Sequence, residues 1–118
     1  MVSAGIGLLL IGILLIAMST AMKGDGLTRN RAVGIRTRAT MASDDAWQQG
    51  HQAAAPWVLS AGIFGVVMSV AAFTMTWAIG DGMSGVTSGV FVCVAFGALI
   101  ALILVSTRVA NRAARQAQ

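Results

Sequence analysis

The chain has 118 residues, of which 57% are apolar and only 10% are charged, and its mean hydropathy is +0.80. A soluble domain usually has about 25% charged residues, so this chain has too few polar side chains to cover a water-exposed surface. Low charge and high hydrophobicity exclude intrinsic disorder. A single cysteine excludes an internal disulfide and a cysteine-rich zinc site. The remaining class is a small, single-domain, all-α integral membrane protein.

Three apolar runs are long enough to cross a bilayer, which takes about 20 residues in a helix. They cover residues 2–22, 57–79 and 86–107 and predict a bundle of three transmembrane helices. The first run has no Lys or Arg before it, and its length favours a retained helix over a cleaved signal peptide. Residues 80–82 form a connection so short that the second and third spans must be antiparallel.

The basic residues indicate the orientation in the membrane. All eight fall either in the first loop, residues 23–55, or in the tail, residues 108–118. With three spans, these two segments share one side. Because basic residues are retained on the cytoplasmic side, we expect the N-terminus outside and the C-terminus in the cytoplasm. The isoelectric point near 11.3 then reflects topology and gives no evidence of direct nucleic-acid binding.

Each predicted span has a stripe of small residues, and such surfaces allow membrane helices to pack closely. The glycines expected at helix contacts are Gly62, Gly65, Gly85, Gly89 and Gly97. We expect the stripes to meet inside the bundle. An alternative is that the Gly85/Gly89 face packs against a second copy of the chain or against a partner subunit.

The first loop contains a predicted helix start. Ser43 is a predicted N-cap, and Asp44 and Asp45 follow in the first turn, where the helix dipole favours acids. A short interfacial helix over residues 44–55 would place Trp47 and His51, four residues apart, on one face. Pro56 would then lie in the first turn of the second span, where its missing N–H does no harm.

The segment from residue 30 to residue 51 resembles the signature of the SdpI family of bacterial membrane proteins. That signature is an asparagine, then Gly-Ile-basic-Thr, a hydroxyl residue, a Ser-acid helix start, a tryptophan and a histidine four residues later. The matching residues here are Asn30, Gly34, Arg36, Thr37, Thr40, Ser43, Trp47 and His51. We call residues 30–51 the loop motif. Arg38 and Ala39 depart from the family pattern, which commonly has Pro and an aromatic residue at these positions.

The resemblance implies a receptor or immunity protein. The type member protects a bacterium from its own secreted peptide toxin and sequesters a repressor at the membrane when the toxin is bound. By this analogy, the bundle and the loop motif would bind a membrane-active peptide or a cytoplasmic regulator. The alternative function is a small accessory subunit of a larger cell-envelope or respiratory complex, and a lipid-interacting enzyme component ranks last.

Two roles stay open for the charged and titratable residues of the loop motif. Arg36 and Arg38 are suited to hold an anionic headgroup or a peptide carboxylate, or Arg36 bonds helix ends or Asp44. His51 either hydrogen-bonds the loop, which we expect to dock through Trp47, Ile35 and Val33, or acts as a pH sensor. One histidine and no glutamate make a metal site unexpected. Without a nucleophile–base pair or an ionisable residue inside a span, we expect neither an enzyme, nor a cofactor, nor a transporter.

Overall fold

The computed structural model describes residues 1–24, 28–29 and 34–117. Its three long helices are α1 (Val2–Lys23), α2 (Asp44–Ile79) and α3 (Gly85–Gln116). Two short 3-10 helices, η1 (Thr40–Ala42) and η2 (Gly80–Gly82), lie in the connections. Each long helix is apolar and long enough to cross a membrane. The predicted class, an all-α protein with three spans, is therefore confirmed.

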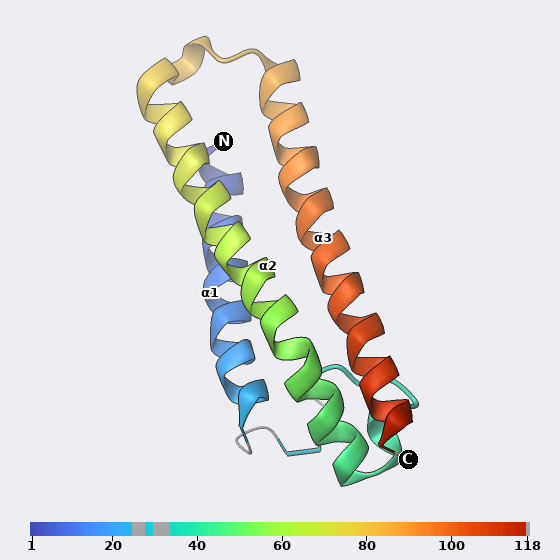
Figure 1. Cartoon of the computed structure of the whole chain (residues 1–118). Helices are drawn as coiled ribbons and strands as arrows, with labels where there is room; N and C mark the ends of the chain where they lie inside the picture. The colour runs from blue at the N-terminus through green and yellow to red at the C-terminus, as the bar shows by residue number, and fades with distance from the viewer. Residues whose placement is uncertain (25–27, 30–33, 118) are drawn as a thin grey trace.

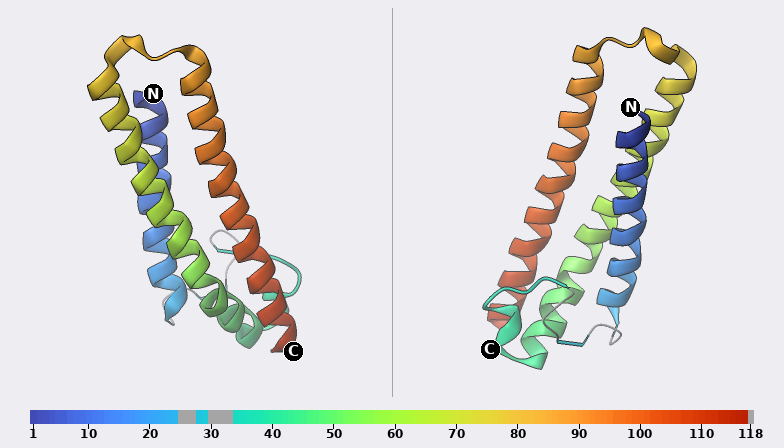
Figure 2. Two further views of the ribbon diagram at one scale, coloured as in Figure 1. Left: turned by 45° about the horizontal axis from the view of Figure 1, so that its top comes forward. Right: turned by 180° about the vertical axis from the view of Figure 1, so that it is seen from behind.

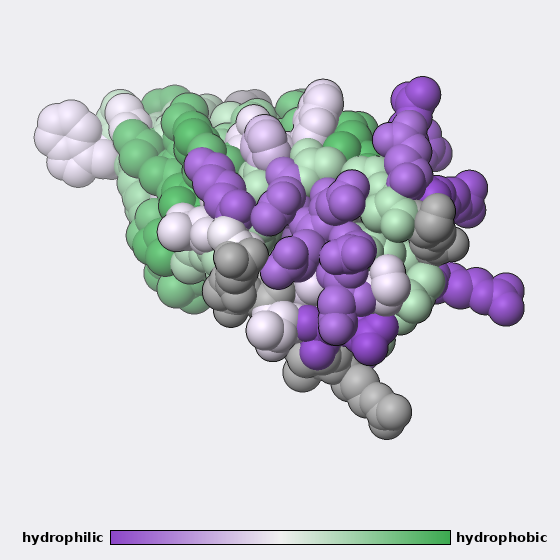
Figure 3. Space-filling view, turned by 60° about the horizontal axis from the view of Figure 1, so that its bottom comes forward, coloured by the Kyte–Doolittle hydropathy of each residue, from purple (hydrophilic) through white to green (hydrophobic). Residues whose placement is uncertain are grey.

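The helices run along the long axis of a molecule that measures 55 × 22 × 21 Å (Figure 1). The chain N-terminus lies near the η2 end, and α2 and α3 are antiparallel (Figures 1 and 2). At the opposite end, α1 ends at Lys23, α2 begins at Asp44, and α3 ends beside η1 and the loop. We call this the basic end, because the described Lys and Arg side chains belong to these segments (Figure 3).

Glycines bring the backbones of α1 and α2 into contact. A Cβ added to Gly12 would lie 2.8 Å from the carbonyl oxygen of Gly62, and one added to Gly62 would lie 2.9 Å from that of Gly12. A Cβ on Gly65 would lie 3.2 Å from the Cα of Gly12. These are backbone atoms, which cannot move aside like a flexible side chain. Gly62 and Gly65 therefore lie at a close contact between two helices, as predicted.

The third glycine stripe does not pack inside the bundle, and the expectation that it would is wrong. A Cβ on Gly85, Gly89 or Gly97 would meet nothing within 4 Å in the described chain. Instead, α3 turns Ala95 and Leu99 inward, where they join a buried cluster with Leu8 of α1 and Ala61 of α2. Larger side chains, including Phe64, Phe91 and Phe96, pack against this cluster. Packing of the Gly85/Gly89 face against a second copy or a partner stays a prediction.

The predicted short interfacial helix is not separate, because residues 44–55 form the first turns of α2. Pro56 lies inside this helix rather than at its start, so the carbonyl of Gln52 has no N–H to accept. Both residues are exposed, which leaves this carbonyl on the outer side of the helix. On the inner side, Ala54 and Ala55 are buried against Met22 of α1. The predicted tail is likewise helical, because α3 continues past residue 107 to Gln116.

The connection between α2 and α3 is the predicted tight antiparallel turn. Gly80 has φ +61°, a left-handed conformation that glycine adopts without steric cost. The side chain of Ser84 accepts the backbone N–H of Thr87 at 3.1 Å and so caps the start of α3.

Candidate functional site

The loop motif is anchored to α2 by the side chain of His51, which is only 1% exposed. Its Nδ1 lies 2.7 Å from the carbonyl oxygen of Trp47, one turn earlier on the helix. Its Nε2 lies 2.9 Å from the backbone nitrogen of Ile35 in the loop. A carbonyl oxygen can only accept and a backbone N–H can only donate. Nδ1 therefore carries the proton, and Nε2 accepts the N–H of Ile35.

These contacts favour the neutral form of His51. Burial lowers the pKa of His51 below its ordinary value of 6.5, and the hydrogen bond to the Trp47 carbonyl partly opposes this shift. His51 lies in the polar first turns of α2, outside the apolar segment at residues 57–79. A proton on Nε2 would face the N–H of Ile35, so protonation requires this hydrogen bond to break. The structure thus assigns His51 the role of holding the loop.

Gly34 allows the loop to pass directly over the two rings of α2. Its φ is +109°, a region that residues with a Cβ rarely adopt. An added Cβ would also lie 2.7 Å from Nε2 of His51 and 3.1 Å from the ring of Trp47. The Trp47 and His51 rings lie 4.1 Å apart between centroids, and Trp47 is only 1% exposed. The docking of the loop through Trp47 is therefore confirmed.

Two threonines fold the next part of the loop and tie it to α3. Thr40 is fully buried; its Oγ1 donates to the carbonyl of Ile35 at 2.7 Å and accepts the backbone N–H of Thr37 at 2.9 Å. The Thr37 hydroxyl donates to Oδ1 of Asn111 on α3. Ile35 packs against the buried cluster that includes Met22. The loop motif is thus joined to α2 through His51 and to α3 through Thr37.

Next to Thr40, helices α2 and α3 approach each other closely at Gly50. A Cβ on Gly50 would lie 3.0 Å from the carbonyl oxygen of Ala110 on α3 and 3.1 Å from Cγ2 of Thr40. Ala46, Gly50 and Ala54 are buried at four-residue spacing on α2, opposite buried Ala110 and Ala114 on α3. Small residues here allow α2, α3 and η1 to approach at one point.

The remaining polar residues of the loop motif have different surroundings. Ser43 is the N-cap of α2, as predicted, because its Oγ accepts the N–H of Ala46 at 3.0 Å. Asp44 forms an ion pair with Arg29, with Nε and Oδ1 3.3 Å apart. Arg36 and Arg38 are exposed. Asn30 and the expected docking residue Val33 lie outside the described residues.

An apolar cavity of about 160 Å³ lies beneath the loop motif. Its walls come from all three long helices and from the loop: Leu15, Met18, Met22, Gly34, Ile35, Val58, Ile103 and Ser106. The loop residues in this wall directly adjoin His51, since Ile35 donates to it. An apolar group in this cavity would therefore touch both the membrane bundle and the anchored part of the loop motif.

Three site residues are absent from the sequence-based predictions. Asn111 and Arg29 are polar residues whose partners become neighbours only in the folded chain, so no local spacing indicates them. Gly50 could have been predicted as a helix-contact residue, because Ala46, Gly50 and Ala54 form a small-residue stripe like those in the spans. In the described part of the chain, no group of three or more His, Cys, Asp or Glu residues is placed to hold a metal ion.

Comparison with known proteins gives one match. No curated protein and no solved structure matches this chain. The model of the SdpI/YfhL protein family matches residues 26–107, which include most of the loop, α2 and the apolar part of α3. This match covers more than half of the chain and contains the whole loop motif. The chain therefore belongs to the SdpI/YfhL family and is an integral membrane protein, with three helices among its described residues that are long and apolar enough to cross a membrane.

Proposed function

We propose that this chain is a non-catalytic receptor or immunity protein. In this proposal it resides in a bacterial cell membrane with the basic end in the cytoplasm. The bundle binds a membrane-active peptide, and the loop motif passes this binding on to a cytoplasmic regulator. Support comes from family membership together with the apolar cavity shared by all three long helices and the loop motif.

The hydrogen bonds of the loop motif supply a route for such coupling. Ile35 forms part of the cavity wall and also donates to His51 on α2. Thr37, two residues later, donates to Asn111 on α3. An apolar peptide side chain in the cavity would press on Ile35 and on the helices that hold the loop. Occupancy would then change the spacing of α2 and α3 and the surface that the loop presents.

A protection assay tests the proposal. The protein is produced in a strain that is sensitive to membrane-active peptides, and survival is measured against each candidate peptide. We expect protection by the natural chain and its loss in Ser106→Phe, because the buried Ser106 side chain faces the cavity. Leu104→Phe is the matched control, since Leu104 is 58% exposed and does not line the cavity.

The amount of protein in the membrane is measured for each variant, so that a folding failure is separated from a loss of binding. Unchanged killing by every candidate peptide, with the natural chain present in the membrane, would refute the receptor proposal. Equal protection by Ser106→Phe would instead refute the assignment to this cavity.

The outward glycine face of α3 favours a second candidate function. Gly85, Gly89 and Gly97 leave open space along a helix whose neighbours Val86 and Val90 are 78% and 58% exposed. An accessory subunit would use this face to pack against a larger membrane complex. Purification in a mild detergent tests this candidate, and a particle no larger than the monomer in its micelle contradicts it.

A further inference from the structure

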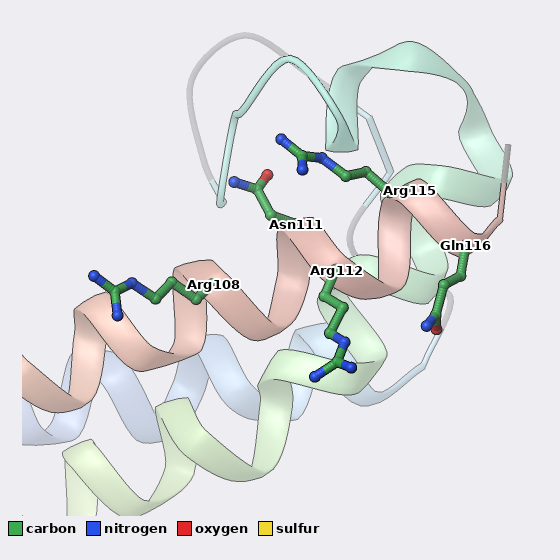
Figure 4. A pocket seen from close by; sticks show the side chains of 5 residues that line it. All are labelled: Arg108, Asn111, Arg112, Arg115 and Gln116. Atoms are coloured by element: carbon green, nitrogen blue, oxygen red, sulfur yellow. The ribbon is translucent and has the colours of Figure 1, made fainter.

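Arginines line one face of the last turns of α3, which we call the arginine face: Arg108, Arg112 and Arg115. With Asn111 and Gln116 they border a surface concavity of about 410 Å³ (Figure 4). Arg115 and the loop residue Arg38 border a second concavity of about 290 Å³. These residues come from two segments far apart in the sequence, and the fold brings them together at the basic end.

The positive charge of this surface is not neutralised within the described chain. No described carboxylate forms an ion pair with Arg38 or with the arginine face, and Asp44 is paired with Arg29 instead. Arg38 and the three arginines of the arginine face are exposed. Their guanidinium groups carry a full charge at any physiological pH. The surface is therefore suited to an anionic ligand.

The same face of α3 continues into the membrane as an apolar surface. Ile100 and Leu104 are 55% and 58% exposed and precede Arg108 and Arg112 at steps of four residues. Such steps keep side chains on one side of a helix. From Arg108 to Arg115 the helix rises about 10 Å, comparable with the headgroup layer of one leaflet, about 5–8 Å. Lipid chains beside Ile100 and Leu104 would thus carry their phosphates to the arginines.

The arrangement of the guanidinium groups distinguishes a lipid layer from a small free anion. Figure 4 shows that the side chains of the arginine face end at separate places along the helix and do not converge on one point. A free phosphate needs donors that converge on it, whereas a leaflet offers phosphates at successive positions around the helix. We propose that the arginine face binds anionic phospholipids of the leaflet at the basic end, with guanidinium N–H groups donating to phosphate oxygens.

The test uses the purified full chain in an uncharged detergent. Phosphatidylglycerol, phosphatidylcholine or glycerol 3-phosphate is added, and the apparent affinity and the thermal unfolding midpoint are measured. We expect phosphatidylglycerol alone to bind and to raise the midpoint. Replacing the arginine face by glutamine (R108Q, R112Q and R115Q) should weaken this affinity about fivefold for each arginine removed. Lys23→Gln, which removes an exposed charge at the end of α1, should leave the affinity nearly unchanged.

Several results would overturn the proposal. Phosphatidylglycerol binding by the triple variant at natural strength would show that the arginine face is not the site. Equal effects of phosphatidylcholine would show that charge is irrelevant, and equal effects of glycerol 3-phosphate would show that a free phosphate is the ligand. If the triple variant does not fold, the salt dependence of lipid binding by the natural chain still tests the proposal. Its phosphatidylglycerol affinity must fall as salt is added, and an affinity independent of salt contradicts the proposal.

Discussion

At the scale of single residues, the loop motif is a set of side chains that hold the backbone of the loop against α2 and α3. His51 accepts the N–H of Ile35, and the Thr40 hydroxyl accepts the N–H of Thr37 and donates to the carbonyl of Ile35. Gly34 allows the loop backbone to pass close to the His51 ring. These hydrogen bonds satisfy polar groups of the partly buried loop, and leaving a buried donor or acceptor unpaired costs about 1–3 kcal/mol. The side chains so used are not available to bind a ligand directly.

Replacing Gly34 by alanine should release the loop. The left-handed backbone costs a residue with a Cβ about 1–2 kcal/mol, and the added Cβ would lie 2.7 Å from Nε2 of His51. We expect trypsin cleavage between residues 29 and 38 to accelerate by about five- to thirtyfold. Gly24→Ala is the matched control, because a Cβ there meets nothing within 4 Å. Equal cleavage of natural chain and Gly34→Ala would contradict the docked loop.

The docking of the loop should weaken in acid. Because the pKa of His51 is lowered in the folded chain, the released loop takes up the proton first. Docking free energy is then complete above pH 6.5, the ordinary value, and falls as the pH drops from there toward the folded pKa. Cleavage rates are measured against pH and divided by those of Trp47→Ala, in which the loop is expected to be released throughout.

His51→Gln is the control for this titration, since its amide can accept from Ile35 without titrating. Its normalised cleavage should not vary with pH. If the natural chain shows the same flat profile, His51 does not control the docking.

At the scale of helices, the structure contains two kinds of glycine surface with different partners. Gly12, Gly62 and Gly65 place the backbones of α1 and α2 in contact, while Gly85, Gly89 and Gly97 face away from the described chain. The sequence shows only that both sets follow helical spacing. Which stripe lies inside depends on where the large side chains of all the helices fit together, and no single helix contains that information.

Leucine substitutions should separate these two surfaces. Gly62→Leu forces side-chain atoms into the backbone of α1, where a Cβ already lies 2.9 Å from Gly12, and should cost about 1–3 kcal/mol. Gly89→Leu extends into open space and should leave the unfolding midpoint of the monomer unchanged. A destabilised Gly89→Leu monomer would contradict the packing described for α3.

At the scale of the whole molecule, composition and hydropathy were sufficient to predict the three spans, their antiparallel turn and the sharing of one end by loop and tail. The N-cap at Ser43 and the face shared by Trp47 and His51 were also predictable, because they depend on local spacing. The continuity of α2 through Pro56 was not, since it depends on Ala54 and Ala55 packing against α1. Nor was the contact between Thr37 and Asn111, which joins residues 74 positions apart.

The charge distribution predicts on which side of the membrane the basic end lies. In a Cys93→Ser background, a cysteine at the exposed position Ala42 should be unreactive toward a reagent confined to the cell exterior. A cysteine at Gly82, exposed at the other end, should be labelled. The opposite pattern would place the loop motif outside and exclude a cytoplasmic regulator as its partner.

The docking of the loop depends most on the neutral, buried imidazole of His51, which joins the loop to α2. Nitrogen-15 NMR of the His51 ring, in the full chain reconstituted in lipid at neutral pH, reads its protonation directly. We predict a neutral ring with the proton on Nδ1 and an acceptor shift at Nε2. A ring protonated on Nε2, in either its neutral or its charged form, cannot accept the N–H of Ile35 and would contradict the docked loop.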